Sequence, residues 1–314
     1  MKNTLFAVGE ALIDFIPDNK GCGFSEVSSF SPKVGGAPAN VLGAFSKLGG
    51  KTQLITQLGS DPFGDKIAEE LAAYGIGLDY TVRTNKANTA LAFVSLAENG
   101  DRTFSFYRNP SADMLYSGEN LTSADFHDCY ALHFCSVSLG DFPMKAAHKK
   151  AIAYARENGA IISFDLNIRL PLWDSEEKLK KAVNEFLPLA DIVKVSDDEL
   201  EFLTGGGDIK DGAKEILKNS KLVLCTCGSK GAYAFSKKCS VFAPSAAVNA
   251  CDTTGAGDAF CGSFLYNLYR NNITNEMLSE LSKNTLEEFL NCSNVYCAKS
   301  VCKYGAIESY PNEL

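Results

Sequence analysis

The sequence predicts a single α/β domain with a mainly parallel central sheet and helices on both faces, and two observations support this. Apolar strand-like runs alternate with amphipathic helical runs through most of the 314 residues, and this rhythm is typical of parallel sheets with crossover helices. The length fits one large α/β domain or two ordinary ones. Because no Pro-, Gly- or Ser-rich linker divides the chain, we expect a single domain over residues 1–314.

The individual elements follow from short apolar runs and from helical spacing. Strands are predicted over residues 5–8, 52–58, 160–164, 192–195, 222–226 and 232–235. Helices are predicted over residues 41–48, 62–74 and 259–270, and a further helix carries the apolar stripe Met144, Ala147, Ala151 and Tyr154.

Residues 89–97 and 102–108 break this rhythm. They are two strand-like runs joined by Glu98-Asn99-Gly100-Asp101, and Asn-Gly in a short connection predicts a β-hairpin. Because side chains alternate along a strand, one face of the second run carries Arg102, Phe104, Phe106 and Arg108. We interpret the hairpin as part of a small sheet that projects over a ligand. The alternative is an edge hairpin packed on the core.

Composition excludes several classes of protein. The net charge of −8 argues against nucleic acid or an anionic membrane as the main partner. The first 17 residues have no signal-peptide pattern, and no later run has the ~18 apolar residues of a membrane span. Eleven cysteines, several of them in apolar runs, fit reduced thiols in a cytoplasmic protein. The three histidines match no zinc motif.

The most informative motif is Asp252-Thr-Thr-Gly-Ala-Gly-Asp258-Ala-Phe260. Its small residues leave the backbone open to a charged ligand, and the apolar spacing that follows predicts a helix opening at this turn. Free N–H groups at a helix start attract phosphate or a developing oxyanion. Asp258 would repel a phosphate but suits a general base beside a transferring phosphoryl group. The alternative is a first-turn acid that favours the helix dipole.

Polar residues also follow the predicted strands near the N-terminus. Asp14 comes after the strand 5–8, and we expect it at the strand's carboxyl end, where open α/β sheets bind ligands. Its carboxylate could accept hydrogen bonds from vicinal hydroxyls, although a surface acid is the alternative. Gly35 and Gly36 let backbone amides approach a ligand, and Asn40 both donates and accepts. Alternatively, the glycines form a simple turn that Asn40 caps.

Two later segments complete the candidate site. Arg169 follows the strand 160–164 and could bind a substrate or a phosphate. Thr226-Cys-Gly228-Ser-Lys-Gly231 joins two strands, and its glycines permit a nucleotide nearby; an ordinary hairpin is the alternative. Common nucleotide motifs are missing. Phe45 replaces the first glycine of a P-loop, and Phe260 replaces the third glycine of a dinucleotide fingerprint.

Taken together, these segments resemble the two signatures of the ribokinase-like (PfkB) carbohydrate kinases. The first is Gly35-Gly-Ala-Pro-Ala-Asn40 with a following Leu48-Gly-Gly, and the second is the Asp252–Phe260 motif. The resemblance covers essentially the whole chain. Three segments, Val8–Asp14, Tyr107–Asp113 and Phe164–Arg169, are most similar to bacterial fructokinases. The resemblance implies a ribokinase-like three-layer α/β fold with a small β-sheet lid, formed by segments 15–33 and 88–113.

The resemblance also implies roles for individual residues. Asp258 would be the base, and the backbone of Gly255, Ala256 and Gly257 the anion hole for the γ-phosphate. The sugar would be bound by Asp14, Gly35, Gly36, Asn40, Phe104, Phe106, Arg108 and Arg169. The nucleotide would lie near Thr226, Gly228, Gly231 and Asn294, of which Asn294 lies in a loosely matching stretch. Asp252 and Thr254 match positions that in many members help bind a monovalent cation beside the anion hole, for which K⁺ is the candidate here.

One departure concerns the metal. The family's Asn-x-x-Glu motif near magnesium reads Ser196-Asp-Asp-Glu199 here, so the glutamate is retained and the asparagine is a serine. Glu199 would hold Mg²⁺ through water.

The expected activity is an ATP-dependent sugar kinase with Mg²⁺ and K⁺ that phosphorylates a hydroxymethyl group, foremost O6 of D-fructose. Alternatives are a 2-keto-3-deoxygluconate kinase, whose acidic substrate would favour an additional cation, and a catalytically silent sugar sensor. The expected partner is a small-molecule sugar, and pairing of two chains through the lid stays open.

Overall fold

The computed structural model describes residues 2–18, 21, 23–96 and 102–314. A nine-stranded sheet runs through the molecule in the order β13-β12-β11-β10-β9-β8-β1-β4-β5. Its strands are β1 Thr4–Val8, β4 Lys51–Gly59, β5 Thr81–Thr84, β8 Cys129–Cys135, β9 Ile161–Asp165, β10 Ile192–Ser196, β11 Leu222–Thr226, β12 Gly231–Ser236 and β13 Ser240–Pro244. All neighbours are parallel except β12, which is antiparallel to β11 and β13.

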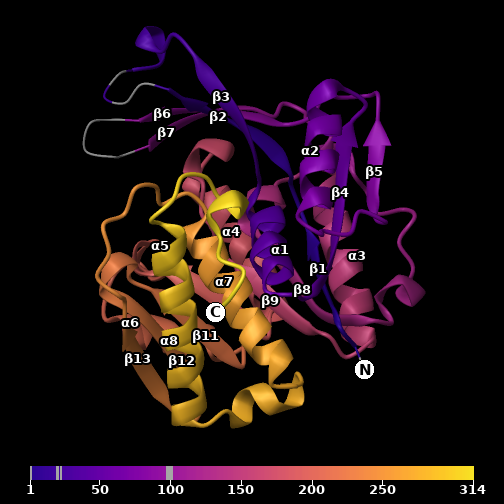
Figure 1. The fold of residues 1–314 in the computed structure, drawn as a ribbon. Coiled ribbons are helices and arrows are strands. Elements are labelled where there is room, and N and C mark those ends of the chain that lie inside the picture. Colours follow the sequence, from indigo (N-terminus) through magenta and orange to yellow (C-terminus); the bar gives the residue numbers. More distant parts are fainter. Residues whose placement is uncertain (1, 19–20, 22, 97–101) are drawn as a thin grey trace.

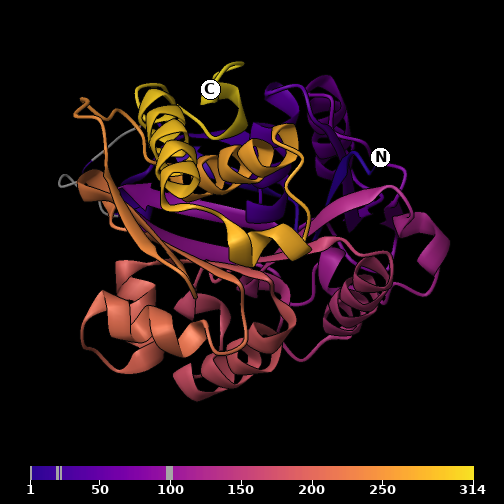
Figure 2. The ribbon, with the colours of Figure 1, turned by 90° about the horizontal axis from the view of Figure 1, so that it is seen from below.

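Helices cover both faces of this sheet, and Figure 2 shows the sheet between them. One face is covered by α1 Ala37–Lys47, α7 Ala256–Arg270 and α8 Lys283–Ser300, and the other by α3 Pro143–Glu157, α4 Glu176–Phe186, α5 Asp197–Thr204 and α6 Ile209–Ile216. The helix α2 Pro62–Ala73 packs beside β4. The central strands are apolar on both sides because each contributes to two separate cores.

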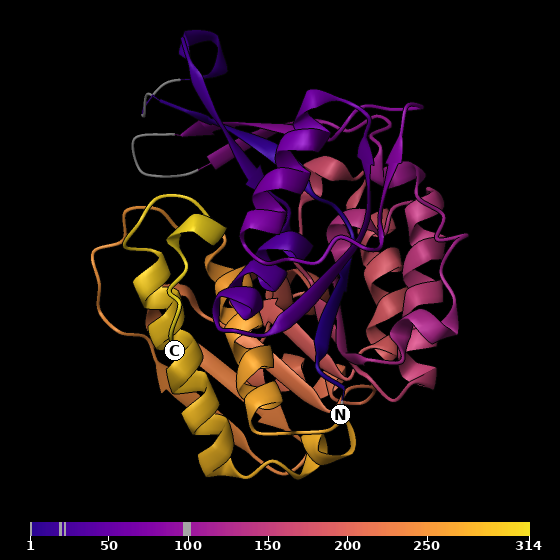
Figure 3. The ribbon, with the colours of Figure 1, turned by 45° about the vertical axis from the view of Figure 1, so that its right-hand side comes forward.

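A second, four-stranded sheet stands above the main body (Figures 1 and 3). Its order is β3-β2-β6-β7, with bounds β2 Leu12–Pro17, β3 Phe30–Gly35, β6 Leu91–Leu96 and β7 Arg102–Tyr107. The strands β6 and β7 are antiparallel, as the predicted hairpin requires. The Asn99-Gly100 connection lies outside the described residues.

The structure confirms the predicted α/β class and corrects some of its elements. The strands β5, β8 and β13 were not predicted, and β2 and β3 were expected only as an unspecified part of the lid. The helices α1 and α7 begin four and three residues earlier than the apolar spacing indicated, at Ala37 and Ala256, because small residues with no apolar periodicity form their first turns.

Asp14 lies in β2 of the small sheet, so the expectation that it ends the first parallel strand is wrong. β1 already ends at Val8, and Gly9 then adopts a φ of 148°, a conformation that suits glycine. The chain therefore leaves the large sheet before Asp14 is reached. Glu10, and not Asp14, is the acid at the carboxyl end of β1.

Candidate active site

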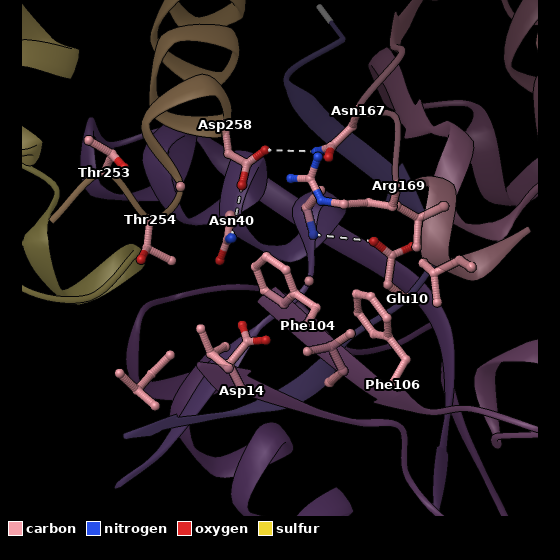
Figure 4. Close-up of a pocket in the computed structure, with 18 residues that line it drawn as sticks. Glu10, Asp14, Asn40, Phe104, Phe106, Asn167, Arg169, Thr253, Thr254 and Asp258 are labelled. Atoms are coloured by element: carbon pink, nitrogen blue, oxygen red, sulfur yellow. Dashed lines mark hydrogen bonds between the residues drawn. The ribbon is translucent and has the colours of Figure 1, made fainter. Parts of the chain in front are cut away.

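A cavity of about 260 Å³ opens between the two sheets, and we call it the acidic cavity (Figure 4). Three carboxylates line it, those of Glu10, Asp14 and Asp258, with the guanidinium of Arg169. The rest of its lining is Leu12, Ile16, Gly36, Ala37, Asn40, Val94, Phe104, Phe106, Val137, Asn167, Leu172, Thr253, Thr254 and Gly255. Carboxylates and amides beside two aromatic rings suit a small polyhydroxy ligand.

The start of α7 forms the floor on one side of this cavity. Gly255 precedes the helix with a φ of 70°, so its left-handed conformation favours glycine. A side chain there would overlap the Tyr310 hydroxyl, which donates a hydrogen bond to the Gly255 carbonyl at 2.8 Å. The turn therefore brings the backbone of the first helical turn to the cavity, with the positive end of the helix dipole behind it, and within the turn Ala256 N donates to the Thr253 carbonyl at 3.2 Å.

Asp258 lies in the first turn of α7 and is 7% exposed. Its Oδ2 accepts a hydrogen bond from Asn40 Nδ2 at 2.9 Å, and its Oδ1 accepts one from Asn167 Nδ2 at 3.4 Å. Burial raises the pKa of the Asp258 carboxyl, while the Asn40 hydrogen bond and the charge of Lys194 oppose that rise. A buried carboxylate with a raised pKa is a better proton acceptor than an exposed one.

The side chain of Asp14 in β2 lies over Gly35 of β3, whose direct cross-strand partner is Leu12. A side chain at Gly35 would overlap the Asp14 carboxylate, so glycine here gives Asp14 its space. Phe104 and Phe106 project from β7 with their rings stacked at 5.6 Å, and both line the acidic cavity. The small sheet thus supplies one wall of the cavity, and α1, α7 and the segment after β9 supply the others.

Arg108 lies apart from the other candidate sugar-binding residues. Its side chain is 4% exposed and forms an ion pair with Asp113, and it lines a neighbouring cavity rather than the acidic one. Arg169 is exposed, donates to the carbonyl of Ile168 at 2.9 Å, and lines the acidic cavity.

A second cavity, of about 480 Å³, lies on the other side of the α7 turn. Thr226, Gly228, Gly231 and Asn294 all line it, together with Ala256 and Gly257. Asn294 donates to the carbonyls of Ala243 and Pro244 at 2.9 and 3.2 Å, so its amide fixes the β13 end of this wall.

The segment 226–231 is both the predicted hairpin and part of the second cavity. Thr253 lines both cavities, so they meet at the glycine turn.

The residues expected near metal ions have well-defined partners. The Glu199 carboxylate accepts from the backbone N–H groups of Ile168 and Ser196, both at 2.8 Å. Asp252 Oδ1 accepts from Thr254 N at 2.9 Å and from Thr254 Oγ1 at 2.6 Å, and its Oδ2 accepts from Gly305 N at 2.9 Å. Within the described residues, no group of three His, Cys, Asp or Glu side chains is arranged to hold a metal.

Sequence reasoning missed a buried ion pair behind the α7 turn. Lys194 Nζ lies 3.0 Å from Asp165 Oδ1, and both side chains are at most 7% exposed. A Cβ added to Gly257 would lie 3.0 Å from the Lys194 ammonium, so this charge is packed directly against the turn. Burial lowers the pKa of Lys194, but the carboxylates of Asp165 and Glu199 outweigh it and keep the ammonium charged. The sequence did hold one signal for this pair, because Lys194 is a charged residue inside the otherwise apolar strand 192–195.

The decisive comparison is with sequence families: residues 2–313 match the pfkB family carbohydrate kinase model. The chain belongs to the PfkB family of carbohydrate kinases. This confirms the predicted family. Among the described residues, no helix combines the length and apolar character needed to cross a membrane.

Individual PfkB relatives are similar over nearly the whole length. A probable fructokinase-5 of Arabidopsis thaliana is 40% identical over 315 residues, which cover 99% of this chain and 96% of that protein. Fructokinase from Xylella fastidiosa with bound ATP is 34% identical, with a TM-score of 0.88 over 99% of this chain and 96% of that one. A fructokinase double mutant from Vibrio cholerae O395, bound to fructose, ADP and potassium ion, is 30% identical, with a TM-score of 0.84 and coverage of 99% and 96%.

Proposed function

We propose that this carbohydrate kinase is an ATP-dependent fructokinase that transfers the γ-phosphate of ATP to O6 of D-fructose. The observation that carries the proposal is the position of the α7 turn, which has Asp258 and the acidic cavity on one side and the second cavity on the other. A sugar and a nucleotide bound in these cavities would meet at the turn. The fructokinase relatives support fructose as the sugar.

In the acidic cavity, Asp14 and Asn40 would bind sugar hydroxyls and orient the hydroxymethyl group toward Asp258. The Asp258 carboxylate would accept the proton of that hydroxyl as the oxygen attacks phosphorus. The amides of Gly255, Ala256 and Gly257, with the Lys194 ammonium behind Gly257, would stabilise the negative charge that develops on the transferring group.

The second cavity would bind ATP along the glycines of the β11–β12 hairpin, with the triphosphate directed toward the α7 turn. Mg²⁺ usually takes one or two carboxylates together with waters and phosphate oxygens, so the lack of a three-carboxylate cluster among the described residues is compatible with it. Glu199 would hold the ion through water, and when bound the ion would neutralise phosphate charge. The small sheet would act as the lid, and pairing of two chains through it stays a prediction.

We expect the protein with ATP and Mg²⁺ to turn over D-fructose with a higher kcat/KM than ribose, glucose or 2-keto-3-deoxygluconate. The reason is that the acidic cavity presents three carboxylates and one guanidinium, a lining that suits an uncharged polyol. A coupled ADP-release assay over about a dozen sugars measures this. A higher kcat/KM for the keto-acid would contradict the fructokinase assignment, and no turnover of any sugar would favour a sensor.

We also expect K⁺ to raise kcat and Na⁺ to do so poorly. Asp252 accepts hydrogen bonds from Thr254 and Gly305, which hold its carboxylate beside the α7 turn, where it could bind a cation together with neighbouring carbonyls. A cation there would add positive field behind the anion hole. The assay compares K⁺, Na⁺ and neither in Tris buffer at equal ionic strength. Identical kcat in all three would assign Asp252 to capping alone and leave the kinase proposal intact.

A further inference from the structure

A buried charge cluster joins the base of the small sheet to the large one, outside the proposed catalytic groups. Arg108 follows β7, and its Nη2 pairs with Asp113 and donates to Ser138 Oγ at 3.3 Å. Ser138 Oγ in turn donates to Glu10 Oε2 at 2.7 Å. The side chains of Arg108 and Asp113 are 4% and 1% exposed. A single hydroxyl thus separates the guanidinium from a carboxylate that lines the acidic cavity.

The charge of Arg108 is balanced inside this cluster, so Arg108 does not act as a free cation for the acidic cavity. Burial lowers the pKa of its guanidinium, but the charges of Asp113 and Glu10 more than offset this, so the group stays charged and is neutralised by two carboxylates. Because Arg108 balances Glu10, the charges left in the lining that the structure describes are Arg169 against the two acids Asp14 and Asp258. A sugar carboxylate entering this cavity would meet more negative than positive charge.

We propose that Asp113 is a specificity-determining positioning residue, which holds Arg108 away from the acidic cavity so that the site takes neutral sugars and rejects sugar acids. The proposal rests on the proposed sugar kinase function. It depends on the buried pair, because loss of the Asp113 charge would leave the guanidinium opposed by Glu10 alone, so the cluster beside the acidic cavity would repel an acidic ligand less. Phe106 lines both the acidic cavity and the cavity of Arg108, so the two spaces adjoin.

The test is the ratio of kcat/KM for D-fructose to kcat/KM for 2-keto-3-deoxygluconate. Asp113→Asn keeps the shape and removes the charge, so we expect the ratio to fall roughly tenfold or more, the size of one charge-assisted hydrogen bond. Ser111→Ala is the matched control, because Ser111 donates to the other oxygen of Asp113 without touching Arg108, and it should leave the ratio unchanged. Adding Arg108→Gln to Asp113→Asn should restore the wild-type ratio.

The outcomes separate this inference from the proposed function. Loss of both activities in equal proportion in Asp113→Asn would mean a structural role alone and overturn the inference, while fructose turnover by the wild type would still stand. The inference would also be overturned if the ratio stayed low in the double variant that carries both Asp113→Asn and Arg108→Gln. Thermal melting of the wild type gives a test that needs no variant. A stabilisation by the sugar acid as large as that by fructose contradicts rejection of acids.

Discussion

Replacing Asp258 by asparagine is expected to lower kcat by roughly 10²–10⁴, the usual contribution of a general base. The substitution keeps the shape, and the new amide oxygen still accepts the hydrogen bond from Asn40, the shorter of the two that Asp258 receives. Sugar affinity should change little because Asp14 and Asn40 carry that binding. Steady-state kinetics with fructose, and titration calorimetry for the sugar, separate the two effects.

Two controls accompany this variant. Asp65→Asn removes the first-turn acid of α2, which lies outside both cavities, and should leave kcat unchanged; a loss there would point to helix-dipole effects. The wild-type rate should fall toward acid below the raised pKa of Asp258, because the protonated carboxyl accepts no proton, and Asp258→Asn should lack this acid limb. A variant that retains more than a tenth of kcat, with chemistry limiting, would exclude Asp258 as the base.

Asp14→Ala is expected to weaken sugar binding by about ten- to a hundred-fold while leaving ATP binding unchanged. The substitution removes the carboxylate that Gly35 leaves room for, so bound hydroxyls lose a charged acceptor worth about 1.5–3 kcal/mol. Calorimetric titration with fructose, and with ATP in the absence of sugar, measures both affinities.

Asp18→Ala is the matched control for Asp14. It removes a carboxylate just after the same strand, where its partners are Ser29 and Ser31, and it does not line the acidic cavity. Its sugar affinity should equal that of the wild type. Equal losses for fructose and ATP in Asp14→Ala would indicate misfolding or a mistaken site.

The sequence was sufficient to predict the structure where the turn, the helix and the functional side chain all lie in one short segment. The turn before α7 is such a case, because Gly255, the following helix and Asp258 lie within one turn of each other. The hairpin β6–β7 was likewise close to what alternation and turn residues predict. In each case the physics that decides the structure acts between near neighbours in the chain.

Side-chain pairs that form only because two strands are neighbours in the sheet could not be predicted from the sequence. Lys194 and Asp165 meet because β9 and β10 are adjacent and in register, with Lys194 opposite Asp165. Arg108 was assigned to the sugar site by the family resemblance, which agreed with its place on the strand face of the two phenylalanines. Asp113, only five residues later, folds back and pairs with it. Asp14 was placed on the wrong sheet because the end of the first strand at Val8 was predicted correctly, but the second strand that begins at Leu12 was not.

The hydrogen bond between Asn40 and Asp258 has a consequence for how the protein matures. It joins residues 218 positions apart, and β1, among the first segments to be synthesised, lies between β4 and β8 in the interior of the sheet. Ribosomal synthesis proceeds from the N-terminus, so the site cannot assemble until α7 has emerged, when most of the chain is already made. Contacts of such long sequence separation form slowly because a large loop must close first. The nascent chain therefore spends most of its synthesis time without a competent catalytic centre.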